Sequence, residues 1–238
     1  MPFPLMKILV GIIIFLVSTT ANSACVILLH GLARTEGSME NLEHSLVSEG
    51  YQTVNLGYPS REHDIEQLAE EAITPALEEC HSDEDVNFVT HSLGGILVRQ
   101  YLSTKEIPNL KYVVMLGPPN MGSEVVDKLN NVPGFKIING DAGMQLGTGE
   151  LSVPNSLGPA TFDVGIIAGN KSINLFLSYL IPGTDDGKVS IESTRLKGMN
   201  DHIEIPTTHT FMMTNDEVIS QVIYYLKNGS FERNTNDN

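Results

Sequence analysis

The segment Thr90–Gly95 reads THSLGG and joins two apolar stretches of different period. Residues 85–90 before it are typical of a short buried strand, and the apolar residues between Ile96 and Leu102 recur at helical spacing. A serine between a strand and a helix, with small residues two positions before and after it, predicts a sharp turn that lifts the hydroxyl out of the sheet. Ser92 is therefore a candidate nucleophile, which requires a base, an acid and an oxyanion hole from the rest of the chain.

The apolar pattern of the chain predicts an alternation of strands and helices. Buried strands are expected at 25–30, 51–56, 86–90, 111–116 and 163–169, with a weaker one at 202–205. Amphipathic helices are expected at 38–49, 64–80 and 216–227. This order predicts an α/β fold with a mostly parallel central sheet, helices on both faces, and reactive groups at the carboxyl ends of the strands.

The helix at 64–80 carries two local signals. Asp64 followed by Gln67 resembles a capping box at its start. Pro75 lies inside it and should kink or interrupt it.

The first 24 residues have the pattern of a secretory signal peptide. Lys7 precedes an apolar run at 8–17, and small residues follow up to Ala24. The run is about half of the ~20 residues that a membrane-spanning helix needs, so no stable span is expected. Lipidation of Cys25 is the alternative, although Asn22 fits that recognition box poorly. We expect a secreted or periplasmic protein whose residues 25–238 form one domain.

The net charge of the chain limits the kinds of molecule that it can bind. The net charge of −15 makes nucleic acid or an anionic membrane an unfavourable partner, because phosphates would be repelled.

The two cysteines of a secreted chain invite a disulfide. Cys25 opens the first strand and Cys80 closes the helix before the serine strand, so both belong at the end of the sheet away from the candidate site.

Two stretches depart from the alternation. Residues 131–160 are rich in Gly and Asn and show no strong periodicity, so they form either a short lid or a long connection, and we favour the lid. Residues 229–238 are polar and are expected to form a flexible tail.

The base and the acid should follow Ser92 in the order acid, then histidine. His209 lies in a loop after the last expected strand, whereas His202 lies at the start of that strand and at the wrong end of the sheet. Asp186 stands directly before a glycine and can present its carboxylate from a tight turn, with Asp185 as the competing candidate.

The oxyanion hole needs two backbone N–H groups. Leu93 follows the nucleophile and supplies one; Leu32, which follows His30 and Gly31 after the first strand, supplies the other. His30 is expected to be a structural hydrogen-bonding residue. His91 points away from the serine hydroxyl and is also expected to be structural.

These motifs, together with Leu116-Gly-Pro-Pro-Asn-Met-Gly-Ser123, occur in an order that resembles the lipase/esterase branch of the α/β-hydrolase superfamily over nearly all of residues 25–238. Two departures are present. Thr90 replaces the first glycine usual in the serine motif, and Asn120 stands where such lipases often carry histidine, which bears on substrate preference.

The resemblance implies a serine esterase or lipase that acts on a small acyl ester or lipid through an acyl-enzyme. It implies neither cofactor nor metal, and we expect a monomer. A thioesterase or an acyltransferase that uses the same serine is the alternative, and a catalytically inactive binding protein is a third interpretation. The apolar residues near these motifs are candidate lining residues of the substrate pocket: Leu32, Met121, Met144, Phe211 and Met212.

Overall fold

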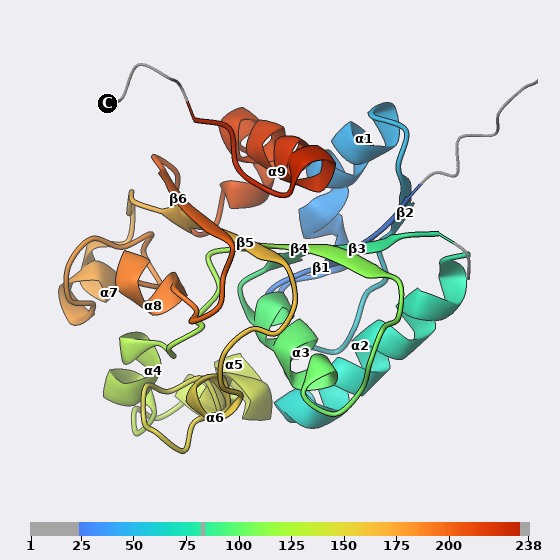
Figure 1. Ribbon diagram of the computed structural model, residues 1–238. Coiled ribbons are helices and arrows are strands. Elements are labelled where there is room, and N and C mark those ends of the chain that lie inside the picture. Colours follow the sequence, from blue (N-terminus) through green and yellow to red (C-terminus); the bar gives the residue numbers. More distant parts are fainter. Residues whose placement is uncertain (1–23, 82–83, 234–238) are drawn as a thin grey trace, which may run out of the picture.

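The computed structural model describes residues 24–81 and 84–233 (Figure 1). All but the last residue of the predicted signal peptide, and residues 234–238 of the predicted tail, lie outside these ranges. The first five tail residues pack on the domain, where the Phe231 ring is buried against that of Tyr225. No helix in the described part is long and apolar enough to cross a membrane.

The centre of the fold is a sheet to which the described residues contribute six strands, all paired in parallel, in the order β2-β1-β3-β4-β5-β6. The strands are β1 (Cys25–Leu29), β2 (Gln52–Val54), β3 (Val86–His91), β4 (Leu110–Leu116), β5 (Val164–Gly169) and β6 (Asp201–Ile205). The predicted parallel α/β sheet is confirmed. Its central strands are buried because helices cover both faces, which explains their nearly continuous apolar sequences.

Two layers of helices enclose the sheet. On one face lie α1 (Glu40–Ser48), which follows the short helix η1 (Glu36–Met39), and α9 (Asp216–Asn228), which follows η2 (Met212–Thr214); on the other lie α2 (Ile65–Glu79) and α3 (Leu93–Leu102) (Figure 1). The shorter helices surround the carboxyl ends of β4 and β5: α4 (Glu124–Leu129), α5 (Phe135–Met144), α6 (Val153–Ser156), α7 (Leu175–Leu180) and α8 (Ile191–Thr194).

Helix α2 bears on both local predictions made for it. Of the two effects expected of Pro75, interruption does not occur, because the helix continues through this residue. At its start the Asp64 carboxylate accepts a hydrogen bond from the Gln67 N–H at 2.9 Å. The Gln67 side chain does not reach back to Asp64 but donates to Glu71, so only one half of the capping box is formed.

A disulfide joins Cys25 to Cys80, as the sequence suggested, and ties the start of β1 to the end of α2. Because these positions lie at the amino end of a parallel sheet, the bridge is remote from the carboxyl ends of the strands. A disulfide of this kind indicates an oxidising compartment.

Residues 131–160 contain α5 and α6 and are held to α3 by one buried side chain. The Arg99 guanidinium donates to the carbonyl oxygens of Pro154 at 2.8 Å and Gly158 at 2.9 Å. It also donates to the carbonyl oxygen of Asn120 at 3.0 Å. The segment thus contains two helices, and a cation on α3 satisfies two of its carbonyl groups.

Candidate active site

Ser92 occupies the turn between β3 and α3 in a strained conformation, with φ of 53° and ψ of −116°. A non-glycine residue in this region costs about 1–3 kcal/mol and persists only where its surroundings enforce it. Here the Ser92 N–H donates to the Leu116 carbonyl oxygen at 2.9 Å, and the Gly95 N–H returns to the Ser92 carbonyl oxygen at 3.1 Å. The hydroxyl is therefore presented from a fixed backbone at the carboxyl end of the sheet.

The residues around Ser92 show why small side chains recur there. A Cβ on Gly94 would lie 2.7 Å from the Leu29 carbonyl oxygen, and one on Gly31 would lie 2.7 Å from His91 Nδ1. Thr90, in the position where glycine is usual, is fully buried between its strand neighbours Leu29 and Met115. The sheet accommodates this threonine without displacing the turn.

Asp186 and His209 form a buried pair. His209 Nδ1 lies 2.7 Å from Asp186 Oδ2, and the His209 backbone N–H donates to the Asp186 carbonyl oxygen at 2.8 Å. The other carboxylate oxygen accepts from the N–H groups of Lys188 at 3.0 Å and Val189 at 2.8 Å. With the Nδ1 proton directed at the carboxylate, Nε2 of His209 is the ring atom that can accept a proton.

Asp185 lies on the same turn but takes no part in this pair. Its carboxylate accepts from the Ser178 hydroxyl and from the Gly187 N–H, both at 2.7 Å. The structure therefore brings Asp186, and not its neighbour, to His209.

Two glycines that our sequence interpretation overlooked make room for the pair. Gly117 follows β4 with φ of +54°, and a Cβ there would lie 3.0 Å from Asp186 Oδ2 and 3.1 Å from His209 Nδ1. Gly169 ends β5, and its Cβ would lie 2.8 Å from Asp186 Cβ. Their position in the sequence could have revealed them. Gly117 follows β4, which pairs with the strand that leads to Ser92, and Gly169 ends β5, which pairs with β4.

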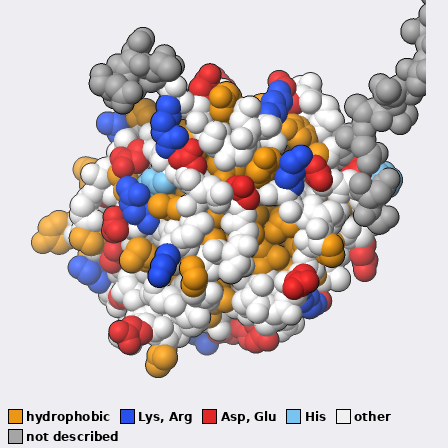
Figure 2. All heavy atoms as spheres, viewed as in Figure 1, with side chains coloured by type: hydrophobic (Ala, Val, Ile, Leu, Met, Phe, Trp, Pro, Cys, Tyr) orange, Lys and Arg blue, Asp and Glu red, His pale blue; other side chains and the backbone are white. Residues whose placement is uncertain are grey.

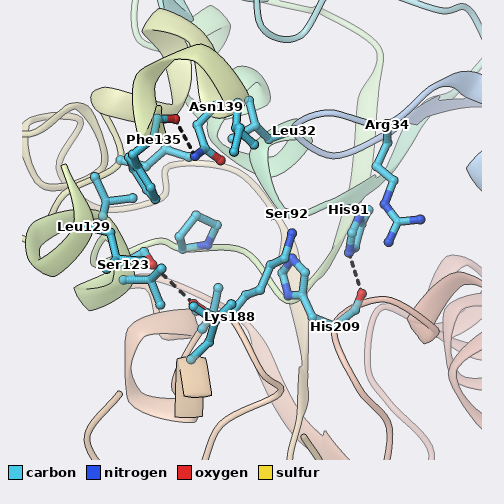
Figure 3. Close-up of a pocket in the computed structure, with 17 residues that line it drawn as sticks. Leu32, Arg34, His91, Ser92, Ser123, Leu129, Phe135, Asn139, Lys188 and His209 are labelled. Carbon is cyan, nitrogen blue, oxygen red and sulfur yellow. Dashed lines mark hydrogen bonds between the residues drawn. The ribbon is translucent and has the colours of Figure 1, made fainter. Parts of the chain in front are cut away.

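Ser92 and His209 line one cavity together with His91 (Figure 3). The His91 ring braces the histidine loop, with Nε2 2.9 Å from the His209 carbonyl oxygen. Burial, and then the charge of a protonated His209, hold the pKa of His91 well below its usual value, so His91 is neutral. A neutral ring that donates to a backbone carbonyl supports the structural role expected of it.

The loop after β1 presents Leu32 to the same cavity. Its backbone is fixed at both sides, since the Ala33 N–H donates to Ser60 Oγ at 3.0 Å and the Arg34 N–H donates to the Gly31 carbonyl oxygen at 3.2 Å. Leu93 begins α3 directly after Ser92. Within the described residues neither the Leu32 nor the Leu93 N–H donates a hydrogen bond, so both donors are available to a bound group.

His30 and His202 are engaged elsewhere. His30 Nδ1 lies 2.9 Å from the Gly31 carbonyl oxygen, and its ring stacks on Tyr58 at 4.0 Å. Burial lowers the pKa of His30. His202 Nε2 lies 3.0 Å from Thr194 Oγ1, and burial lowers the pKa of His202 to about 4.

The cavity has a volume of about 360 Å³ and a mainly apolar lining. Our sequence-based choice of its walls was correct only for Leu32. Met121, Met144, Phe211 and Met212 lie outside the lining, whose apolar residues come mainly from helices α4, α5 and α7. The apolar members are Leu32, Pro119, Val125, Val126, Leu129, Phe135, Ile138, Leu146, Leu177 and Val189; the polar members besides the histidines and Ser92 are Arg34, Ser123, Asn139 and Lys188.

Helix α7 also exposes apolar side chains beside the cavity. Leu177 points to the cavity, while Leu175, Phe176 and Tyr179 are 79%, 67% and 88% exposed. In Figure 2 hydrophobic side chains project from the edge of the molecule where α7 lies in Figure 1.

Asn120 lies behind the cavity rather than in its lining. It is 2% exposed, its amide donates to the Thr194 carbonyl oxygen at 2.9 Å, and its side-chain oxygen accepts from Arg99 at 3.2 Å. The residue therefore links the loop after β4 to helices α3 and α8. No group of three or more His, Cys, Asp or Glu residues in the described ranges is placed to hold a metal ion.

Comparison with solved structures identifies the architecture. The Bacillus licheniformis lipase BlEst2 in its mature form superposes with a TM-score of 0.69 and 18% sequence identity, over 87% of this chain and 92% of the other. The chain has the α/β-hydrolase fold.

Other proteins with the α/β-hydrolase fold superpose less closely. Phospholipase PlaB from Legionella pneumophila has a TM-score of 0.58 at 20% identity, over 74% of this chain and 46% of the other. Polyneuridine aldehyde esterase has a TM-score of 0.54 at 15% identity, over 87% and 100% of the two chains. No family model matches the sequence, and no curated protein matches it.

Proposed function

We propose that this protein is a serine hydrolase that cleaves carboxylic esters through an acyl-enzyme on Ser92. The observation that carries the proposal is the buried 2.7 Å contact of His209 with Asp186, in a cavity that also contains a serine on a strained strand-to-helix turn. The α/β-hydrolase fold and its lipase and esterase neighbours support the same reaction class.

In the proposed first step, His209 Nε2 takes the proton of the Ser92 hydroxyl as its oxygen attacks the ester carbonyl carbon. The Asp186 carboxylate holds the imidazole in the required tautomer and stabilises the imidazolium that forms. The Leu32 and Leu93 N–H groups donate to the oxyanion of the tetrahedral intermediate; loss of one such donor costs about 10²–10³ in rate.

In the second half, His209 returns the proton to the leaving alcohol and Ser92 keeps the acyl group as an ester. A water molecule, deprotonated by His209, then attacks this ester and releases the carboxylic acid. The apolar lining supplied by α4 and α5 suits the acyl chain. The proposed site of action is the periplasm or the medium, which agrees with the disulfide.

A fluorophosphonate probe with a fluorescent tag tests the nucleophile, because it reacts covalently with an activated serine. We expect the purified chain to be labelled and Ser92→Ala to be silent. Ser123→Ala is the matched control, because Ser123 lines the same cavity and its hydroxyl donates to the Lys188 carbonyl oxygen instead. Labelling that survives in Ser92→Ala but disappears in Ser123→Ala would reject the proposal.

Release of p-nitrophenol from p-nitrophenyl esters of increasing chain length then defines the acyl group. The same assay with an added acceptor alcohol separates hydrolysis from acyl transfer, because only transfer produces a new ester.

A further inference from the structure

The cavity holds two cations beside the reacting serine and, among the described residues of its lining, no acid. Arg34 and Lys188 come from different loops, yet they are close enough for each to repel the other's charge. This is unexpected in a chain with a net charge of −15. Within the described residues neither side chain forms an ion pair or a side-chain hydrogen bond, whereas several other cations of the protein do.

Both cations are held on short turns with fixed backbones. Lys188 follows Gly187, whose φ is +100°; its N–H donates to Asp186 Oδ1 at 3.0 Å and its carbonyl oxygen accepts from Ser123 Oγ at 3.2 Å. Arg34 is two residues after Leu32, and its N–H closes the loop onto the Gly31 carbonyl oxygen. The two turns also carry the acid and one oxyanion donor of the proposed mechanism, so the backbone positions from which both cations extend are fixed relative to the reaction centre.

The electrostatics around Arg34 and Lys188 favour the binding of an anion. Crowding by protein atoms and then the Arg34 charge lower the pKa of the Lys188 ammonium, and the Asp186 charge opposes them. That carboxylate cannot serve as the missing counter-ion, because it is buried and its oxygens are already bonded to His209 and to two backbone N–H groups. A ligand anion that reached both cations would relieve their mutual repulsion and accept charge-assisted hydrogen bonds from them.

The position of the cations relative to the apolar walls indicates which part of a substrate would carry the charge. Figure 3 shows the Lys188 side chain reaching toward Ser92 and His209, with Arg34 beside His91. The aliphatic lining from α4 and α5 lies on the other side of the cavity. His209 gives its proton to the departing alcohol, so the alcohol must occupy the side where the cations lie.

We propose that Arg34 and Lys188 form an anion subsite for the alcohol portion of the ester, and that the preferred substrates are acyl esters of alcohols bearing a phosphate or a carboxylate. This inference rests on the proposed ester hydrolysis at Ser92 and specifies its substrate class. The reaction is ordinary hydrolysis: water is consumed, the acyl C–O bond breaks, and a carboxylic acid and an anionic alcohol are released.

Three matched esters test the subsite: 1-octanoylglycerol, 1-octanoylglycerol 3-phosphate and 3-O-octanoylglycerate. All release octanoate, which titration at constant pH measures at substrate concentrations that keep them monomeric. We expect kcat/KM for at least one anionic ester to exceed that for the neutral ester by about tenfold or more. Whether the phosphate or the carboxylate ester is preferred identifies the anion.

The variants separate a charge effect from a general loss of activity, because the measured quantity is the ratio of anionic to neutral kcat/KM. Lys188→Gln and Arg34→Gln should each lower that ratio about tenfold, and Lys188→Arg should retain it. Lys197→Gln is the control: it removes one charge from an exposed side chain outside this cavity and should leave the ratio unchanged.

Equal rates on neutral and anionic esters in the unmodified protein, or ratios in the Lys188 and Arg34 variants equal to that of Lys197→Gln, would overturn the subsite and leave ester hydrolysis standing. Octanoate release that persists in Ser92→Ala would instead overturn the proposed function, and the inference with it.

Discussion

Replacing Asp186 by asparagine should lower kcat/KM by about 10⁴-fold, although the change alters a single atom of the pair with His209. The reason lies in the other carboxylate oxygen. It accepts hydrogen bonds from the N–H groups of Lys188 and Val189 at 3.0 and 2.8 Å, so an asparagine would keep its carbonyl oxygen there and turn its NH₂ toward His209. Two donors would then face each other across 2.7 Å.

The imidazole can resolve that conflict only by moving its proton from Nδ1 to Nε2. In that tautomer Nε2 is no longer an acceptor and cannot take the Ser92 proton. The expected 10⁴-fold loss corresponds to about 5.5 kcal/mol of transition-state stabilisation. KM should change little, because Asp186 is not part of the cavity lining.

Asp185→Asn is the matched control, since both carboxyl groups are buried and adjacent and both accept from a backbone N–H. We expect its kcat/KM to stay within about tenfold of the unmodified protein, because its partners are Ser178 and Gly187. Initial rates with p-nitrophenyl butyrate measure both variants, and thermal unfolding followed by circular dichroism confirms that each is folded. A folded Asp186→Asn protein within tenfold of full activity would refute the reasoning, as would a larger loss in Asp185→Asn.

Three further results are expected. Replacing both Cys25 and Cys80 by alanine should lower the free energy of unfolding in urea by about 4 kcal/mol, because the bridge closes a loop of 55 residues, while leaving kcat unchanged. Gly117→Ala should lower kcat/KM about 10²-fold by displacing the histidine–carboxylate pair, whereas Gly158→Ala, also at positive φ but with open space at its Cβ, should lower only the thermal midpoint. Folding lowers the pKa of His202 to about 4 from 6.5, so between these pH values the unfolded chain binds a proton at His202 and the folded protein does not. The free energy of unfolding should therefore fall as pH drops from 6.5 toward 4, by at most about 1.4 kcal/mol per pH unit from this group. His202→Gln should flatten that slope in urea titrations.

The strands were predictable because both faces of a parallel sheet are covered, which leaves continuous apolar runs that sequence alone reveals. The order of serine, acid and histidine along the chain likewise follows from the succession of strands. The choice between Asp185 and Asp186 depends on backbone torsions around Gly187, which composition does not encode. The sequence could rank the two carboxylates but could not exclude either.

The walls of the cavity could not be predicted for a different reason. In segment 131–160, α5 contains non-helical torsions at Gly140 and α6 has only four residues, so the sequence shows no sustained helical period. The pairing of Arg34 with Lys188 is visible only in the folded structure, because the two residues are far apart in the sequence and two separate turns bring them to the same cavity.

The bonds made by Arg99 make one side chain responsible for the position of two separate segments. Arg99 lies seven residues, about two helical turns, after Ser92 on α3. Arg99 consequently ties α6 and the loop after β4 to the helix that follows the nucleophile. Loss of this one guanidinium would leave the carbonyl oxygens of Asn120, Pro154 and Gly158 without their shared donor, and would loosen α6 and the loop after β4 together.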